Sequence, residues 1–130
     1  MNRSIRKVLL ICAIVSSLSC YSQENKTKIL GTWSFDRVEF VAHVDANDSL
    51  QTVNGSKGMM VTFLEGNRFI TKRKTSEGIK EVESGDYSIT PDGKSILQND
   101  EQADIVMLND EIFVIKIEGE LIIHFKKEPN

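Results

Sequence analysis

The sequence predicts an all-β fold, an up-and-down antiparallel meander of about eight strands that closes into a β-barrel. From Ile29 onward, short runs alternate apolar and polar residues and are rich in β-branched and aromatic side chains. Turn-forming residues separate these runs, and no stretch repeats apolar residues at helical spacing for three turns. Closure into a barrel leaves no exposed sheet edge, which favours it over the alternative of an open sandwich.

The composition is that of one ordinary globular domain. The chain has 130 residues with 16 Lys and Arg, 19 Asp and Glu, and 40% hydrophobic residues. These values exclude a collagen-like, a disordered or a multi-pass membrane protein. The length predicts a single domain with one modest core.

The first 22 residues have the layout of a secretory signal peptide. A basic start, residues 1–7, precedes an apolar run of eleven residues from Val8 to Leu18. That run is too short to serve as a permanent membrane-spanning helix, which needs about 20 apolar residues. Cleavage after Ser22 would release a soluble, exported protein, either periplasmic or secreted.

Cys20 supports an alternative leader of residues 1–19. The segment Leu18-Ser19-Cys20 resembles the end of a bacterial lipobox, in which the cysteine is lipidated and becomes the first residue of the mature protein. The family pattern has Leu, Val or Ile three positions before the cysteine, where this chain has Ser17. The lipidated form would be a lipoprotein anchored to the outer membrane, and this anchor would be its only link to a membrane.

The mature chain has no cysteine after Cys20, so the domain cannot contain a disulfide. Removal of residues 1–22 leaves 13 basic and 19 acidic residues, a formal charge of −6. This negative balance argues against nucleic acid as a partner.

After the leader we expect a short polar tether at residues 23–28 and a β-barrel domain at residues 29–130. Asp45 to Ser56 is interpreted as a loop between the first two strands. The expected strands are residues 33–44, 58–64, 68–74, 80–83, 86–89, 95–97, 105–108, 112–117 and 121–126.

The apolar pattern fixes the register of the last hairpin. A three-residue loop, Glu118 to Glu120, makes every inward-facing pair apolar, whereas a two-residue loop would mix the faces. The expected pairs are Ile117 with Leu121, Ile115 with Ile123, and Phe113 with Phe125. His124 then points outward. A change of phase between Phe35 and Val38 predicts a bulge near Asp36 and Arg37.

The segment Ile29-Leu30-Gly31-Thr32-Trp33 resembles the Gly-x-Trp opening of the lipocalin superfamily, in which the tryptophan plugs one end of the barrel. The strand order that follows is similar to that of small exported bacterial lipocalin-like proteins, over about Ile29 to Lys127. The resemblance implies non-covalent binding of a small lipophilic ligand inside the barrel. A lysine of the last strand, Lys126 or Lys127, would lie over Trp33.

The interior positions supply the candidate ligand-binding residues. Parity places eighteen mostly large side chains inside, among them Val82 and Leu97, and these either fill the barrel or leave a cavity. Arg73 would lie near the mouth, where it would bind a carboxylate head group or pair with acids across the third hairpin. The candidate ligand-binding residues are Trp33, Phe40, Phe63, Phe69, Arg73, Tyr87, Phe113 and Phe125.

The residues that usually carry catalysis or bind metals are sparse. His43 and His124 are far apart in the sequence, and no Ser lies in a Gly-x-Ser-x-Gly elbow. The acidic segments 45–56 and 100–111 lack the glycine of a calcium-binding loop at its sixth position. We therefore expect no enzymatic activity, no cofactor and no metal site.

A second class of function would use the outside of the barrel. If the apolar residues expected on the outer face were contiguous, they would form an interaction surface. The protein would then be an envelope-associated interaction or structural module with a filled core. These outward residues are Met60, Leu64, Ile70, Ile112, Val114 and Ile122.

Overall fold

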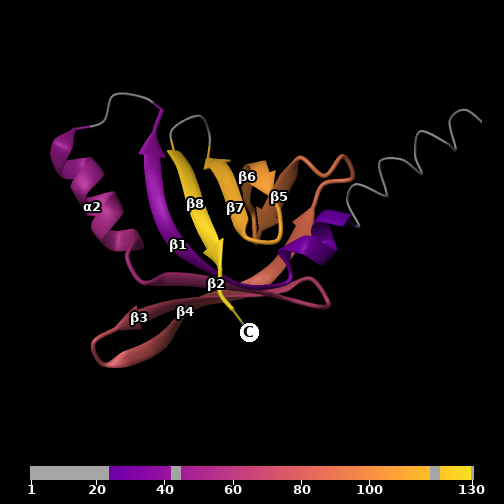
Figure 1. The fold of residues 1–130 in the computed structure, drawn as a ribbon, viewed down its shortest axis with the longest axis horizontal. Helices are drawn as coiled ribbons and strands as arrows, with labels where there is room; N and C mark the ends of the chain where they lie inside the picture. Colours follow the sequence, from indigo (N-terminus) through magenta and orange to yellow (C-terminus); the bar gives the residue numbers. More distant parts are fainter. Residues whose placement is uncertain (1–23, 42–44, 118–120, 130) are drawn as a thin grey trace, which may run out of the picture.

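The computed structural model describes residues 24–41, 45–117 and 121–129, and shows eight antiparallel strands closed into a barrel (Figure 1). Each strand pairs with the next along the chain, and β8 returns to β1. The predicted fold class is therefore confirmed. The predictions for the leader, Cys20 and His43 lie outside the described residues.

One α-helix interrupts the meander between β1 and β2. The elements are β1 (Gly31–Phe40), α2 (Ala46–Ser56), β2 (Met59–Leu64), β3 (Arg68–Thr75), β4 (Gly78–Ile89), β5 (Ser95–Gln98), β6 (Glu101–Leu108), β7 (Ile112–Ile117) and β8 (Leu121–Lys127).

The predicted register of the last hairpin is confirmed. Phe113 lies opposite Phe125, and the other two inward pairs are also those expected. The predicted bulge is present as well, because the pairing of β1 with β8 shifts between Phe35 and Arg37. The bulge keeps apolar residues facing inward on both sides of the bend.

Strand β4 differs from the prediction in two ways. The two strands expected at residues 80–83 and 86–89 form one continuous strand of 12 residues. The pairing of β3 with β4 also shifts, so that Thr71 lies opposite Glu83 and Lys72 opposite Glu81. The residue between them, Val82, is left unpaired and 55% exposed, so its predicted inward position was wrong.

Strand β5 also differs by one position from the predicted parity. Ile96 is fully buried opposite Ile89, whereas Leu97, predicted to point inward, is only partly buried. The preceding turn sets this register, since the Thr90 amide and hydroxyl both bond to the backbone of Ser95.

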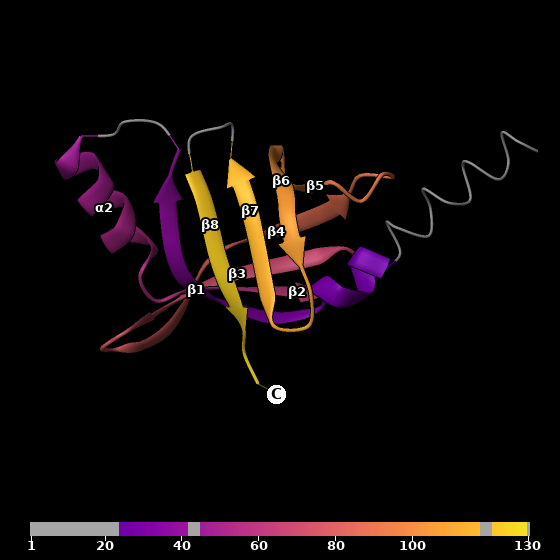
Figure 2. The same ribbon diagram turned by 45° about the horizontal axis from the view of Figure 1, so that its top comes forward.

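The loop predicted for residues 45–56 was wrong, because α2 occupies it beside β1 (Figures 1 and 2). Asp45 caps the helix and accepts a hydrogen bond from the Asn47 amide, and Asp48 lies in the positively polarised first turn. The helix buries none of its residues, and its large apolar side chains are only Leu50 and Val53, too few for the apolar repeat of three turns that identifies a helix in the sequence.

The polar segment interpreted as a tether is helical at residues 24–29. The Asn25 side-chain amide donates to the Gly93 carbonyl at 2.7 Å, and Ile29 is fully buried. This short helix is thus docked onto the barrel. Within the described ranges, no helix is long and apolar enough to cross a membrane.

Candidate functional site

Trp33 packs at the end of the barrel where the short helix 24–29 is docked. Its indole Nε1 donates to the Ile29 carbonyl at 2.8 Å, and its ring lies 5.5 Å from that of Phe113. Lys127 places its Nζ atom 4.5 Å from the centre of the indole ring. Of the two lysines considered from the sequence, Lys127 therefore makes the expected contact, and this end of the barrel is closed.

Gly31 leaves the room that Lys127 needs. A Cβ atom at Gly31 would lie 2.7 Å from the Lys127 Nζ, and the backbone has a φ of +117°, which favours glycine. The Lys127 amine also bonds to the Leu30 carbonyl. Burial lowers the pKa of Lys127, and Asp110 opposes this shift. Packing at the closed end thus explains the Gly-x-Trp pattern.

An aromatic layer fills the closed half of the barrel. Phe63 meets Tyr87 edge-on at 4.9 Å and Phe113 edge-on at 6.0 Å, and all three are buried. Burial raises the pKa of the Tyr87 phenol, so it stays neutral at physiological pH. Phe69 is fully buried in the same cluster. These rings leave little space around Trp33.

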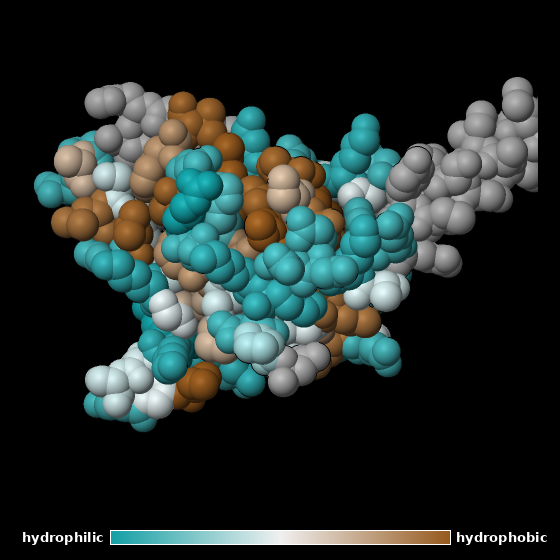
Figure 3. Space-filling model, viewed as in Figure 1, coloured by the Kyte–Doolittle hydropathy of each residue, from teal (hydrophilic) through white to brown (hydrophobic). Residues whose placement is uncertain are grey.

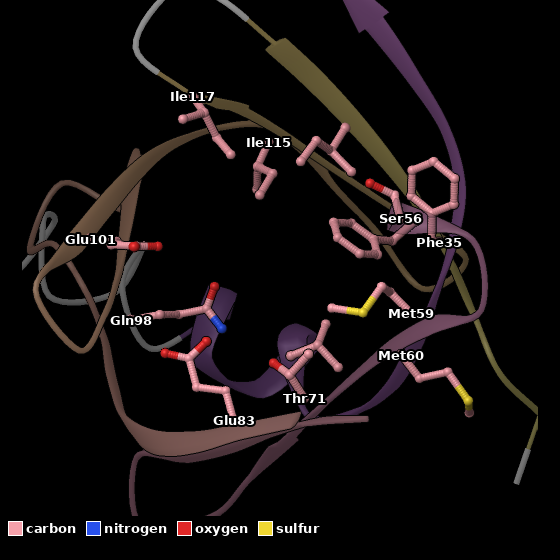
Figure 4. Close-up of a pocket in the computed structure, with 13 residues that line it drawn as sticks. Phe35, Ser56, Met59, Met60, Thr71, Glu83, Gln98, Glu101, Ile115 and Ile117 are labelled. Carbon is pink, nitrogen blue, oxygen red and sulfur yellow. The ribbon is translucent and has the colours of Figure 1, made fainter. Parts of the chain in front are cut away.

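The other half of the barrel contains a cavity of about 250 Å³ (Figure 4). Side chains from all eight strands and from the end of α2 surround it. Its lining residues are Phe35, Ser56, Met59, Met60, Val61, Thr71, Glu83, Gln98, Glu101, Ile115, Ile117, Ile123 and Phe125.

A second space of about 460 Å³ adjoins the cavity near the β5–β6 turn. The two spaces share four lining residues, Gln98, Glu101, Ile115 and Ile117, and Asp100 lines the second one. The cavity is thus continuous with an opening on the β5–β6 side of the barrel.

The two sides of the cavity differ in polarity. Figure 4 shows Glu83, Gln98 and Glu101 on one side, facing Ile115 and the other apolar residues across the space. An Asn99 side-chain N–H donates to Glu83 Oε1 at 3.0 Å and so orients this carboxylate. The cavity therefore combines an apolar wall with a wall of hydrogen-bond acceptors.

Gly85 allows Asn99 to hold Glu83. A Cβ at Gly85 would lie 2.0 Å from the Asn99 Oδ1 atom, so the Asn99 side chain crosses directly over this glycine. We expect Gly85→Ala to displace Asn99 and to lower the free energy of unfolding by about 1–3 kcal/mol, as overpacking does. Urea denaturation followed by tryptophan fluorescence measures the change.

The background Asn99→Gly supplies the control for this prediction. Glycine accepts the positive φ of 53° at residue 99 and removes the clashing side chain. In this background Gly85→Ala should change the free energy of unfolding by less than about 0.5 kcal/mol. An equal loss in both backgrounds would contradict the proposed contact.

The eight predicted ligand-binding residues are not gathered in the cavity. Phe125 lines it, whereas Trp33, Phe63, Phe69, Tyr87 and Phe113 belong to the buried core. Phe40 is partly buried opposite Leu121 and is not among the lining residues.

The acidic side of the site was not among the predicted residues. Glu83 lines the cavity because β4 is one continuous strand, in which Glu83 shares the inward parity of Tyr87 and Ile89, and the bulge at Val82 lies beyond it. Glu101 was missed because β6 begins four residues earlier than predicted. The turn residues Asn99 and Asp100, between two apolar runs, were the available signal for a longer hairpin.

Arg73 bonds to α2 and not to a carboxylate. Its Nη2 atom donates to the Gly55 carbonyl at 2.6 Å and lies 3.4 Å from the Met59 sulfur. In the β3–β4 register, Lys72 faces Glu81 as expected, but Arg73 faces Lys80. Arg73 is outside the lining of the cavity and stabilises the negatively polarised end of α2.

The six apolar residues predicted on the outer face differ in exposure. Leu64 is 41% exposed and Ile112 37%, whereas Val114 is only 4% exposed and Met60, Ile70 and Ile122 are partly buried. On the face seen in Figure 3, hydrophobic residues form separate groups among hydrophilic ones. His124 is partly buried on the outer face of the barrel, 3.4 Å from a Glu39 carboxylate oxygen.

Among the residues that the structure describes, no group of three or more His, Cys, Asp or Glu is placed to hold a metal ion.

Comparisons with solved structures identify the architecture. A crystal structure of a lipocalin-like protein from Bacteroides uniformis matches 78% of this chain and 99% of its own, with a TM-score of 0.54 and 16% identity. The chain has a lipocalin-like fold. An uncharacterized protein from Bacteroides eggerthii shares this lipocalin-like architecture at a TM-score of 0.58 and 11% identity, over 77% of this chain and 99% of its own.

A third similar structure is that of the siderocalin Ex-FABP, with a TM-score of 0.45 and 11% identity over 78% of this chain and 74% of its own. No family model matches the sequence, and the comparison with curated proteins finds no match.

Proposed function

We propose that this protein binds a small, largely apolar molecule non-covalently in the open half of its barrel and catalyses no reaction. The observation that carries the proposal is the 250 Å³ cavity, which lies inside the barrel next to a packed aromatic layer. Small-molecule sites are typically concave and mostly apolar, with a few polar groups that orient the ligand. The cavity has these properties, and the lipocalin-like fold agrees with them.

The inner wall supports an apolar ligand body. Val61 and Ile115 are buried, and Ile117, Ile123 and Phe125 are partly buried. A ligand that covers this wall removes apolar surface from water, which contributes about 25 cal/mol per Å². Because the strands hold the wall in place, little ordering opposes binding.

We further propose that the protein acts outside the cytoplasm. The support is the leader-like sequence of residues 1–22, with Cys20 as the alternative site of lipidation. In either case, few residues separate the processed N-terminus from the docked helix 24–29. A lipid at Cys20 would thus hold the closed end of the barrel near the membrane.

Native mass spectrometry of protein purified gently from its own cell envelope tests these proposals. We expect a non-covalent adduct that is lost on denaturation, on a chain that begins at Gln23 or at an acylated Cys20. Protein without any adduct, under the gentlest extraction and after incubation with an envelope lipid extract, would contradict ligand binding. A chain that retains residues 1–19 would contradict export.

A further inference from the structure

We infer that the ligand is a cationic amphiphile, an apolar body that carries a protonated amine. This inference rests on the proposed function, because it specifies the occupant of the same cavity. It comes from the charges on the polar wall, which neither the fold nor the apolar lining determines.

The ionisable residues that line the two adjoining spaces are all acidic. Glu83 and Glu101 line the first space, and Asp100 and Glu101 line the second. The nearby cation, Arg73, donates to the Gly55 carbonyl beside Met59 and is not itself among the lining residues. A carboxylate accepts hydrogen bonds and donates none, so this wall favours a positively charged donor and repels an anion.

The arrangement of the two walls orients such a ligand. Its apolar body would lie along Ile115, Ile123 and Phe125, and its amine would face Glu83 and Glu101 across the space in Figure 4. The bond from Asn99 fixes one oxygen of Glu83 and leaves the other free for the ligand. Gln98 contributes a side-chain carbonyl beside the carboxylates as a further acceptor. The site therefore has both parts that an amphiphilic amine requires.

Three probes with the same ten-carbon chain test the inference. Isothermal titration calorimetry of the processed protein at neutral pH would compare decylamine, decanol and decanoate. We expect decylamine to bind roughly tenfold more tightly than decanol, with decanoate weaker than both, because two exposed ion pairs of ordinary strength add to the same apolar contact. Added salt should reduce the advantage of the amine and leave decanol binding unchanged or stronger.

The double variant Glu83→Gln/Glu101→Gln should remove the advantage of decylamine and leave decanol affinity within about twofold. The matched control is Glu65→Gln/Glu111→Gln, which makes the same change in net charge at exposed positions in turns. This control should keep the preference for the amine.

The outcomes distinguish the inference of a cationic ligand from the proposal that the barrel binds a ligand at all. Equal binding of all three probes, or tightest binding of decanoate, would overturn the cationic ligand and leave the binding barrel supported. An amine preference that survives the double variant would also overturn it, because the carboxylates would not be its cause. Failure of all three probes to bind would count against both proposals.

Discussion

Replacement of Trp33 by alanine is expected to lower the free energy of unfolding by about 3–5 kcal/mol, the usual cost of removing a buried aromatic side chain. Trp33 is fully buried and contacts three parts of the closed end, namely the helix 24–29, Phe113 and Lys127. Its removal would leave a cavity and also the buried Ile29 carbonyl without its donor. A domain of this size is stable by only about 5–15 kcal/mol, so the variant should be close to unfolding.

Urea denaturation followed by far-ultraviolet circular dichroism is the appropriate measurement, since Trp33 is the only tryptophan. Trp33→Phe separates the hydrogen bond from the packing and should cost about 1–3 kcal/mol. Val82→Ala, at an exposed position in β4, should change stability by no more than about 0.5 kcal/mol. A loss below about 1 kcal/mol for Trp33→Ala would show that Trp33 does not hold this end together.

Much of the barrel could be predicted because the apolar pattern that sets its strands and their pairing lies within short segments of the sequence. In β7 and β8 only a three-residue loop makes every inward pair apolar, so Phe113 could be placed opposite Phe125 from the sequence alone. The phase change between Phe35 and Val38 likewise predicted a bulge that is present. Where only one pairing of the two strands makes every inward pair apolar, the sequence determines the register of the hairpin.

The errors arose where this alternation does not hold. The inward position of Val82 was predicted from residues 80–83 taken as a separate strand, whereas in the continuous β4 a bulge leaves Val82 unpaired and Glu83 shares the inward parity of Tyr87. Helix α2 has only two large apolar side chains, Leu50 and Val53, so its capping residue Asp45 is the clearest sequence signal. The first error is the one that hid the acidic wall of the cavity.

Most of the aromatic residues predicted as ligand contacts lie outside the cavity for a related reason. Large rings such as Phe63 and Phe69 pack against one another and fill the closed half of the barrel. The cavity lies in the other half, where the lining mixes rings such as Phe125 with smaller side chains such as Val61 and Thr71. Sequence parity identifies which residues point inward, but the position along the barrel decides whether they enclose space.

Ile117→Trp is the variant expected to have the largest effect on ligand binding. Ile117 lines both spaces and is the last residue of β7, so its side chain lies near the opening and is only partly buried. An indole at this position would occupy volume that the ligand needs and would have room to avoid the packed core. We expect the affinity for decylamine and for decanol to fall at least tenfold, a loss of about 1.4 kcal/mol or more.

Ile112→Trp is the matched control, because it makes the same substitution at the other end of β7, where Ile112 is 37% exposed. It should bind both probes as the unsubstituted protein does. Ile117→Trp should lower the affinity for decylamine and for decanol, whereas Glu83→Gln/Glu101→Gln should lower the affinity for decylamine alone. Full binding by a folded Ile117→Trp variant, with a circular dichroism spectrum like that of the unsubstituted protein, would place the ligand outside the barrel.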